Sequence, residues 1–171
     1  PADTNINPLV KEVESVSASI NKIKIGVGES YRLETSVTPA DATNQTLIFT
    51  SSNKNVTVNK DGIIKGKKAG TSWIMESSEN GKTARVKVDV KKAPKRFELN
   101  ATTKRLKKGR TFQIKVKLPK KTASHKITFT SNKKSVATVS ATGKVKALKK
   151  GSAVITVKTF NGKKAKLKVV F

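Results

Sequence analysis

Residues 126–155 read KITFTSNKKSVATVSATGKVKALKKGSAVI, and most landmarks of this stretch already occur upstream in LIFTSSNKNVTVNKDGIIKGKKAGTSWI, residues 47–74. Four glycines recur 81 residues later (109 − 28, for example), whereas the Phe-Thr-Ser triplet recurs after 80 residues (129 − 49). One residue inserted between Val136 and Val139 therefore brings the two copies back into the same alignment. A period of this length is the size of a domain and not of a solenoid repeat. The chain is therefore one module written twice. The glycine pairs are Gly28 and Gly109, Gly62 and Gly143, Gly70 and Gly151, and Gly81 and Gly162.

Length and composition limit what each module can be. The 171 residues give two modules of about 80 residues, which is enough for one modest core and too small for a large enzyme. The absence of cysteine excludes disulfides and thiolate chemistry. No apolar run reaches the roughly 18 residues that a membrane-spanning helix needs, so no membrane span is expected. The chain begins at Pro1 without a signal-like segment, which predicts a piece of a longer or processed protein.

Charge is divided unequally between the modules. Residues 1–94 hold 14 Lys and Arg against 10 Asp and Glu, a net charge of +4, whereas residues 95–171 hold 23 against 1, a net charge of +22. The two values add to the +26 of the whole chain. This asymmetry predicts a polyanionic neighbour for the second module, such as wall polymer, nucleic acid or an anionic membrane surface. A merely solubilising surface is the alternative interpretation.

Short β-rich runs alternate with turn residues along both modules, and helical periodicity is absent. In the second module Phe112, Ile114 and Val116 alternate with polar residues, which is typical of an antiparallel sheet with one wet face. Asn80-Gly81 and Asn161-Gly162 predict type I′ hairpins. The expected fold is all-β, with two tandem sandwiches of about seven short strands each. The expected boundaries are a linker or tail over 1–12, a first domain over 13–92, a linker over 93–95 and a second domain over 96–171.

The apolar positions that both modules share in phase predict the two cores. The expected members are Phe49, Ile64, Ile74, Val86 and Val88 in the first module, and Ile114, Phe129, Val145, Ile155 and Leu167 in the second.

The order of the motifs resembles the bacterial immunoglobulin-like group 2 domain. The order is Gly-(Glu/Arg)-(Ser/Thr)-aromatic, Phe-Thr-Ser followed by Asn and Lys, Gly-Lys-Val-Lys-Ala, Lys-Gly-Ser-Ala-Val-Ile and Asn-Gly-Lys. The resemblance covers nearly the whole chain and implies Ig-like β-sandwich repeats. It implies a bacterial secreted or cell-surface protein, similar to intimin and invasin, or a phage virion protein. The implied roles are stalk, adhesive module or wall-associated extension, located outside the cell or at its surface.

The first module departs from the second in one strand. Where residues 153–157 read AVITV, residues 72–76 read SWIME, which puts the carboxylate of Glu76 at an inward position. A bulge or an early strand end near Glu76 is therefore predicted. By alternation from Ile74, Trp73 and Met75 point outward. One interpretation is that they form an exposed apolar surface that contacts a neighbouring module or a ligand. The preferred interpretation is that an adjacent segment of the chain covers them.

The residues that carry chemistry form no recognisable catalytic or metal-binding set. His125 lies beside an expected turn with no acid or cysteine nearby, and Glu98 is the one carboxylate of residues 95–171. No calcium-loop spacing and no phosphate-binding glycine motif occurs. We therefore expect no catalytic residues, no metal site, no cofactor and no enzyme activity.

Three classes of function follow: a structural and interaction module, a targeting module that binds an acidic cell-wall polymer, and, as the weakest, an enzyme. A host surface ligand is an alternative partner. Nucleic acid is expected to bind only without specificity, because the basic residues are mostly lysine and the aromatic residues lie in core phase. For polymer binding, the expected outer face of one sheet comprises Lys126, Lys158, Lys164, Lys166 and Lys168, and the other sheet presents Lys115, Lys117, Lys144 and Lys146.

Overall fold

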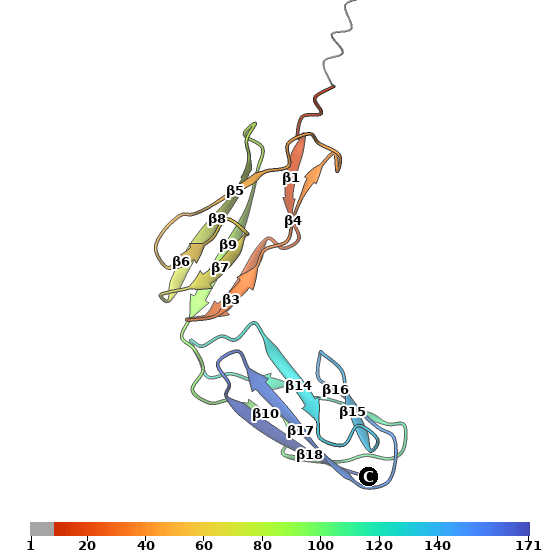
Figure 1. The fold of residues 1–171 in the computed structure, drawn as a ribbon. Coiled ribbons are helices and arrows are strands. Elements are labelled where there is room, and N and C mark those ends of the chain that lie inside the picture. Colours follow the sequence, from red (N-terminus) through yellow and green to blue (C-terminus); the bar gives the residue numbers. More distant parts are fainter. Residues whose placement is uncertain (1–8) are drawn as a thin grey trace, which may run out of the picture. The chain divides into compact units, whose positions relative to one another are not determined.

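The computed structural model describes residues 9–171, and residues 1–8 of the expected 1–12 linker lie outside the described part (Figure 1). The described residues form 18 strands and no helix, which confirms the all-β prediction. The chain divides into two compact units. Unit 1 comprises the residues up to Ile23 together with Ser30–Asp89, and unit 2 comprises Lys24–Glu29 together with Val90–Phe171. The two repeats of the sequence thus correspond to the two units, apart from the short exchange of residues 24–29.

Three sheets hold the strands of the first repeat (Figure 1). The four-stranded sheet has the order β2 (Lys22–Gly26), β9 (Thr83–Lys91), β8 (Gly70–Ser78) and β5 (Leu47–Ser51). The three-stranded sheet has the order β3 (Ser30–Arg32), β7 (Ile63–Gly66) and β6 (Val56–Val58), and the two-stranded sheet pairs β1 (Ser15–Ala18) with β4 (Thr35–Thr38).

The core of unit 1 follows the predicted alternation. Ile64, Ile74, Val86 and Val88 have no exposed surface. Phe49 is half-buried, and its ring packs against Gly62, where an added Cβ would come within 3.0 Å of the ring. Strands with inward apolar residues every second position can therefore pack face to face and leave their alternate positions in water.

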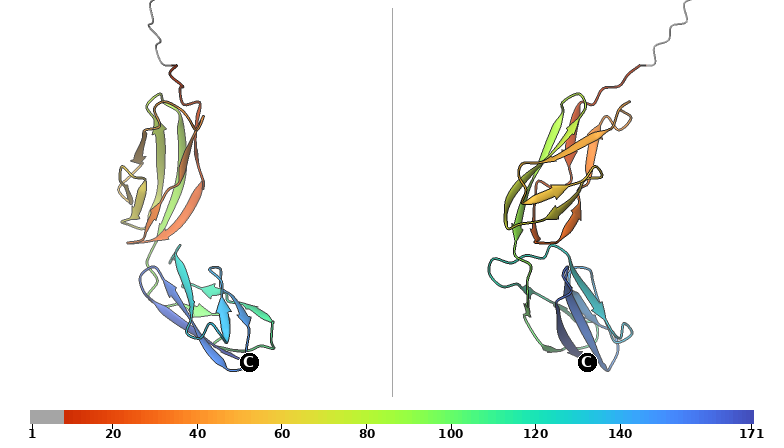
Figure 2. Two further views of the ribbon diagram at one scale, coloured as in Figure 1. Left: turned by 45° about the vertical axis from the view of Figure 1, so that its right-hand side comes forward. Right: turned by 60° about the vertical axis from the view of Figure 1, so that its left-hand side comes forward.

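Unit 2 repeats this arrangement, and β17 and β18 run side by side in every view (Figures 1 and 2). Its four-stranded sheet has the order β11 (Thr103–Arg105), β18 (Lys164–Val170), β17 (Ser152–Thr159) and β14 (Ile127–Ser131), with β11 parallel to β18. Its other sheets are β12 (Thr111–Gln113), β16 (Lys144–Ala147) and β15 (Ala137–Val139), and the pair β10 (Glu98–Leu99) and β13 (Val116–Lys117).

The predicted core of unit 2 is also found. Ile114 is 3% exposed, and Val145, Ile155 and Leu167 are fully buried. Phe129 is half-buried and packs against this cluster, with its ring over Gly143. The two aromatic rings, Phe49 and Phe129, thus cover equivalent glycines, which directly precede β7 and β16, and remain half-buried.

The predicted type I′ turn is wrong. Such a turn needs positive φ at both central residues, but only Gly81 of the Asn80-Gly81 pair has one, +86°. The backbone N–H of Ser78 donates to the carbonyl of Lys82, which leaves a three-residue loop ending in a left-handed glycine. The second repeat closes its hairpin in the same way, with Gly162 at φ +81°. The Asn-Gly pair predicted a two-residue loop, whereas the register of the two strands leaves three residues in the loop.

The predicted bulge or early strand end at Glu76 is also wrong. Strand β8 continues to Ser78, and Glu76 pairs with Phe49 in regular antiparallel register. The Glu76 carboxyl group therefore faces inward with no exposed surface. The long pairing between β5 and β8 keeps the strand straight through a residue that is unfavourable in the core.

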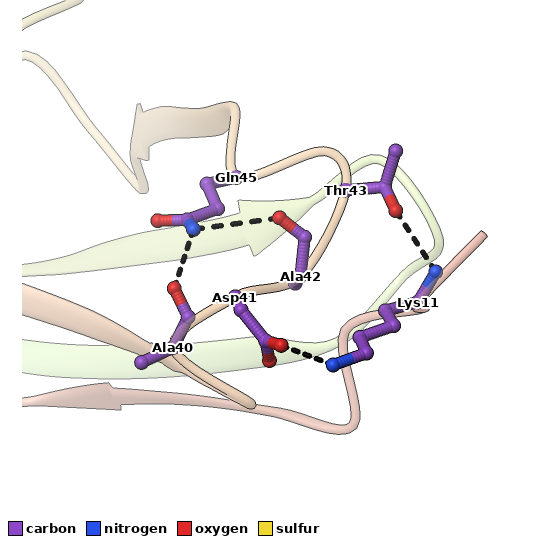
Figure 3. Close-up of polar contacts among 6 residues, drawn as sticks. All are labelled: Lys11, Ala40, Asp41, Ala42, Thr43 and Gln45. Carbon is purple, nitrogen blue, oxygen red and sulfur yellow. Dashed lines mark hydrogen bonds and ion pairs between the residues drawn. The ribbon is translucent and has the colours of Figure 1, made fainter. Parts of the chain in front are cut away.

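The start of the described chain is fastened to unit 1 (Figure 3). The backbone N–H of Lys11 donates to Oγ1 of Thr43 at 2.9 Å, and the Lys11 side chain pairs with Asp41. Gln45 Nε2 donates to the carbonyl of Ala40 at 2.6 Å, which holds the 40–45 loop in shape. These contacts order the chain just ahead of β1.

A buried carboxylate organises the part of unit 2 that precedes β14. Glu29, 3% exposed, accepts hydrogen bonds from the backbone N–H groups of Gly26, His125 and Lys126 at 2.9, 3.0 and 2.7 Å. Three backbone donors satisfy a carboxylate that would be costly to bury alone. Glu29 therefore has a structural role inside unit 2.

Candidate functional site

The four-stranded sheet of unit 2 carries a continuous row of lysines on its outer side. Along β18, Lys164, Lys166 and Lys168 are exposed, whereas Leu167 between them is buried. Lys158 of β17 lies directly opposite Lys164. We call this surface the lysine face; it comprises Lys126, Lys158, Lys164, Lys166 and Lys168.

Lys126 joins the lysine face from the far strand. It immediately precedes β14 and is in phase with the exposed Thr128, which lies opposite Lys158. The structure therefore brings all five predicted lysines to one side of one sheet.

The second predicted basic face is smaller than expected. Lys144 and Lys146 are exposed on β16. Lys117, however, belongs to the separate pair β10 and β13, and Lys115 lies between strands. The expectation that all four share the outer face of one sheet is wrong, because the chain leaves that sheet after β12 and begins a new one at β13.

Two carboxylates of unit 2 lie near or opposite basic residues, but neither belongs to the lysine face: buried Glu29 accepts a hydrogen bond from the backbone N–H of Lys126. Glu98, the one carboxylate of residues 95–171, lies opposite Lys117 on the β10–β13 pair. Like charges directly opposite on neighbouring strands destabilise a sheet, as at Lys158 and Lys164. A bound polyanion would relieve this repulsion, so the face is suited chemically to an anionic polymer.

The outer side of the four-stranded sheet in unit 1 is different, because apolar side chains are exposed there. Trp73 is 41% and Met75 45% exposed on β8, which confirms that they point outward. Ile48 on the adjacent β5 is 54% exposed. Within residues 9–171 no segment buries Trp73 or Met75, so coverage by an adjacent segment, the preferred interpretation, stays a prediction.

Two cationic side chains lie over the Trp73 indole. The Arg85 guanidinium carbon lies 4.9 Å and the Lys87 Nζ 6.0 Å from the ring centroid, both on the neighbouring strand β9. A shallow pocket of about 350 Å³ opens here. We call it the Trp73 pocket; it is lined by Asn21, Lys22, Trp73, Arg85 and Lys87.

Sequence reasoning identified Trp73 but missed the cations beside it. Arg85 and Lys87 stand 81 residues before Lys166 and Lys168 (166 − 85, 168 − 87), two residues of the lysine face. That equivalence, combined with period-two alternation, would have placed Arg85 and Lys87 on the outer side of the sheet. The proximity of Asn21 and Lys22 to Trp73 has no local signal, because it depends on which strands are neighbours.

Among the remaining polar residues of the described chain, Glu76 has a shifted pKa. Burial raises the pKa of Glu76, and the Thr35 hydroxyl, which works in the opposite direction, does not reach an ordinary hydrogen-bond geometry with it. Burial therefore determines the direction of the pKa shift. Among residues 9–171, no group of three His, Cys, Asp or Glu side chains could hold a metal ion. The same residues contain no helix long and apolar enough to cross a membrane.

Comparison with protein families gives two matches in tandem. A model described as the bacterial Ig-like domain (group 2) matches residues 12–88 and again residues 93–170.

Individual relatives match over short parts of their own length. A kappa-carrageenase of Pseudoalteromonas carrageenovora is 45% identical over 69 residues, which are 40% of this chain and 17% of the enzyme. An uncharacterized protein of Clostridium acetobutylicum is 29% identical over 153 residues, 87% of this chain and 16% of that protein. An Ig-like virion protein of Serratia phage KSP90 is 37% identical over 82 residues, 47% of this chain and 32% of the virion protein. The chain thus spans less than a third of each of these relatives.

Solved structures align with the chain at low identity and low TM-score. Domains 5–6 of the S-layer protein SbsC align with a TM-score of 0.42 and 14% identity, covering 92% of this chain and 97% of that one. A C-terminal fragment of intimin aligns with a TM-score of 0.34 and 14% identity, covering 93% and 64%.

Proposed function

The chain belongs to the group 2 family of bacterial Ig-like domains, and from this premise we propose that it is a non-catalytic interaction module of a secreted or cell-surface protein. The relatives have unrelated names, among them an enzyme and a virion protein, and share with this chain only a small part of their length. A segment that accompanies such different proteins serves as an accessory that extends or attaches the parent protein. Its place outside the cell is part of this proposal.

We further propose that the second repeat attaches the parent protein to an acidic cell-wall polymer. The observation that carries this proposal is the lysine face, five exposed lysines on one sheet with the one carboxylate of residues 95–171 on another. Exposed lysines attract flexible polyanions mainly by long-range electrostatics and release of counterions. Such binding has little stereochemical selectivity and weakens steeply with salt, because charges beyond about 8 Å are screened at physiological ionic strength.

The experiment measures retention of the full chain on immobilised teichoic acid and on heparin. The variant Lys164→Glu/Lys166→Glu/Lys168→Glu should elute at clearly lower salt, since it reverses three charges on the lysine face. Its side chains point to water, so the fold should persist. The matched control makes the same change of net charge on exposed lysines of unit 1, Lys60→Glu/Lys67→Glu/Lys68→Glu.

The comparison of the two variants decides the proposal. The control should elute close to the parent chain. Equal losses of retention in both variants would show that net charge alone matters and that the lysine face is only a solubilising surface.

A virion module is the second candidate, favoured by the 37% identity with the phage virion protein. The genes that flank the coding sequence distinguish the two settings. Phage structural genes on either side would support a virion module, and a signal sequence with wall-associated domains would support the surface protein.

A further inference from the structure

We propose that the Trp73 pocket in unit 1 binds an acidic polysaccharide, with a sugar ring stacked on the indole and its carboxylate or sulfate paired with Arg85 and Lys87. This site is separate from the lysine face and rests on a different property, an exposed aromatic ring beside oriented cations.

The exposed indole is the first part of the argument. Trp73 is 41% exposed on an open sheet surface, with the apolar side chains of Met75 and Ile48 exposed on the same side. Aromatic side chains contribute large apolar contact area when covered, and exposed apolar patches mark binding surfaces. A pyranose ring offers an apolar face of C–H groups that can cover the indole without burying any of its hydroxyl groups.

The geometry of Arg85 is the second part. Its guanidinium carbon lies over the indole, 4.9 Å from the ring centroid, so the cation–π contact holds the group against one face of the ring and the sugar would stack on the opposite face. Guanidinium N–H groups that stay available can receive a carboxylate or sulfate in bidentate fashion. Lys87, at 6.0 Å from the same centroid, adds a second positive charge within reach of the same anion.

Charge complementarity selects the occupant. The lining of the Trp73 pocket contains three cations, Lys22, Arg85 and Lys87, and no carboxylate. Asp89 lies further along β9, in phase with Arg85 and Lys87, and is not part of the pocket lining. A second copy of this chain, with a net charge of +26, is disfavoured as occupant. The ligand is therefore anionic.

The shape of the pocket favours a polysaccharide over a protein. A pocket of about 350 Å³ is at the small end of the range for ligand sites and offers one aromatic platform with a few polar groups, here including the Asn21 amide. A stable protein partner would need about 1,000 Å² or more of well-packed interface. A polymer needs only one or two sugar rings seated here while the rest of its chain lies across the sheet.

The second repeat provides the internal comparison. Lys166 and Lys168 occupy the positions of Arg85 and Lys87, but Val154 stands where Trp73 does (154 − 73 = 81), directly opposite Lys168. The second repeat thus has the paired cations without the stacking surface. Binding that depends on sugar identity should follow Trp73, and binding that depends only on charge should follow the lysine face.

The test uses the fact that Trp73 is the single tryptophan of the chain. The full chain is titrated with hexamers of galacturonate, of sulfated galactan and of neutral galactan, and with inorganic polyphosphate, while tryptophan emission is recorded. At least one acidic hexamer should change the emission with saturation, and the arm that responds identifies carboxylate or sulfate as the anion. The neutral hexamer should leave the emission unchanged, and polyphosphate, which has no ring to stack on the indole, should change it clearly less than the responding hexamer.

Variants then separate stacking from charge. Calorimetry should show at least about a tenfold loss of affinity for the responding hexamer in Trp73→Val, which installs the residue of the second repeat, and a similar loss in Arg85→Gln/Lys87→Gln. Trp73→Phe should retain part of the affinity. The Lys164→Glu/Lys166→Glu/Lys168→Glu variant should keep the full emission response, so loss of the lysine-face function leaves this site intact.

Three results would overturn the proposal. The first is an emission that neither acidic hexamer changes. The second is a response to polyphosphate as large as that to the hexamers, which would mean that the site senses charge alone. The third is a saturable response to poly-glutamate but to neither acidic sugar, which would identify an acidic protein as the partner. Retention of Trp73→Val on immobilised teichoic acid, whose phosphates are recognised by charge, should match that of the parent chain.

Discussion

Strands β8 and β17 occupy the same place in their sheets, and their differences separate what the fold needs from what it leaves free. The identical residues Ile74 and Ile155 are fully buried in both. Outward positions diverge, from an exposed Trp73 in β8 to Val154 in β17. Packing in the core thus restricts the residues that point inward. The residues that point outward can differ, and can serve binding, without lowering the stability of the sandwich.

One inward position breaks this rule. Glu76 is fully buried in unit 1, and its equivalent in unit 2 is the fully buried Val157 (157 − 76 = 81). Unit 1 therefore contains a polar group in a layer that unit 2 fills with a hydrocarbon. The comparison predicts that an apolar residue at position 76 would make unit 1 more stable.

The largest expected effect tests the shared inward phase. Ile74→Ala and Ile155→Ala each remove a fully buried side chain and should each lower the free energy of unfolding of their own unit by about 2–5 kcal/mol. Urea unfolding followed by Trp73 emission reports unit 1, and circular dichroism reports both units. A shift below about 1 kcal/mol for either variant would contradict the claim that the two positions are equivalent core sites.

The second prediction tests the inward difference. Glu76→Val should raise the free energy of unfolding of unit 1 by about 1–3 kcal/mol, because it replaces a buried polar group without a hydrogen bond by the residue of the second repeat. Val157→Glu should lower that of unit 2 by a similar or greater amount. The exposed control Glu34→Val should stay within about 0.5 kcal/mol of the parent chain.

The pH dependence sharpens the same test. Burial raises the pKa of Glu76 in the folded state above its ordinary value of 4.5, so folding favours the protonated form. The contribution of Glu76 is at its most favourable below pH 4.5 and is lost as pH rises through the folded pKa. The advantage of Glu76→Val over the parent chain should therefore grow between acid and neutral pH. An advantage that shrinks in this range would contradict the buried position.

The alternating pattern of the sequence was sufficient for the all-β fold and the core phase, because inward apolar positions such as Ile74 and Leu167 depend only on local period. Features that depend on pairing between strands could not be read locally. The turn at Asn80-Gly81 takes its length from the β8–β9 register, and Glu76 stays in strand because β5 pairs beside it.

Contacts between residues far apart in the sequence were even harder to predict from the sequence. Glu29 meets the backbone of Lys126 across 97 positions of sequence, and nothing near Glu29 in the sequence indicates this hydrogen bond. The lysines of β18 were found because they alternate along one strand. Lys22 and Arg85 were missed because they reach Trp73 from other segments of the chain.

The smallest expected effect concerns the outward difference and the stability of Trp73→Val. The indole contacts Arg85 and Lys87 on an exposed surface, where a cation–π interaction contributes about 0.5–1 kcal/mol. Valine favours strands and occupies the equivalent position of β17, so part of that loss should be offset. The free energy of unfolding of unit 1 should therefore fall by less than about 1 kcal/mol, measured by urea unfolding with circular dichroism, since the variant has no tryptophan. A fall of 3 kcal/mol or more, the size of a core substitution, would mean that the indole stabilises the sandwich itself, and its exposure on β8 would then have a structural rather than a binding role.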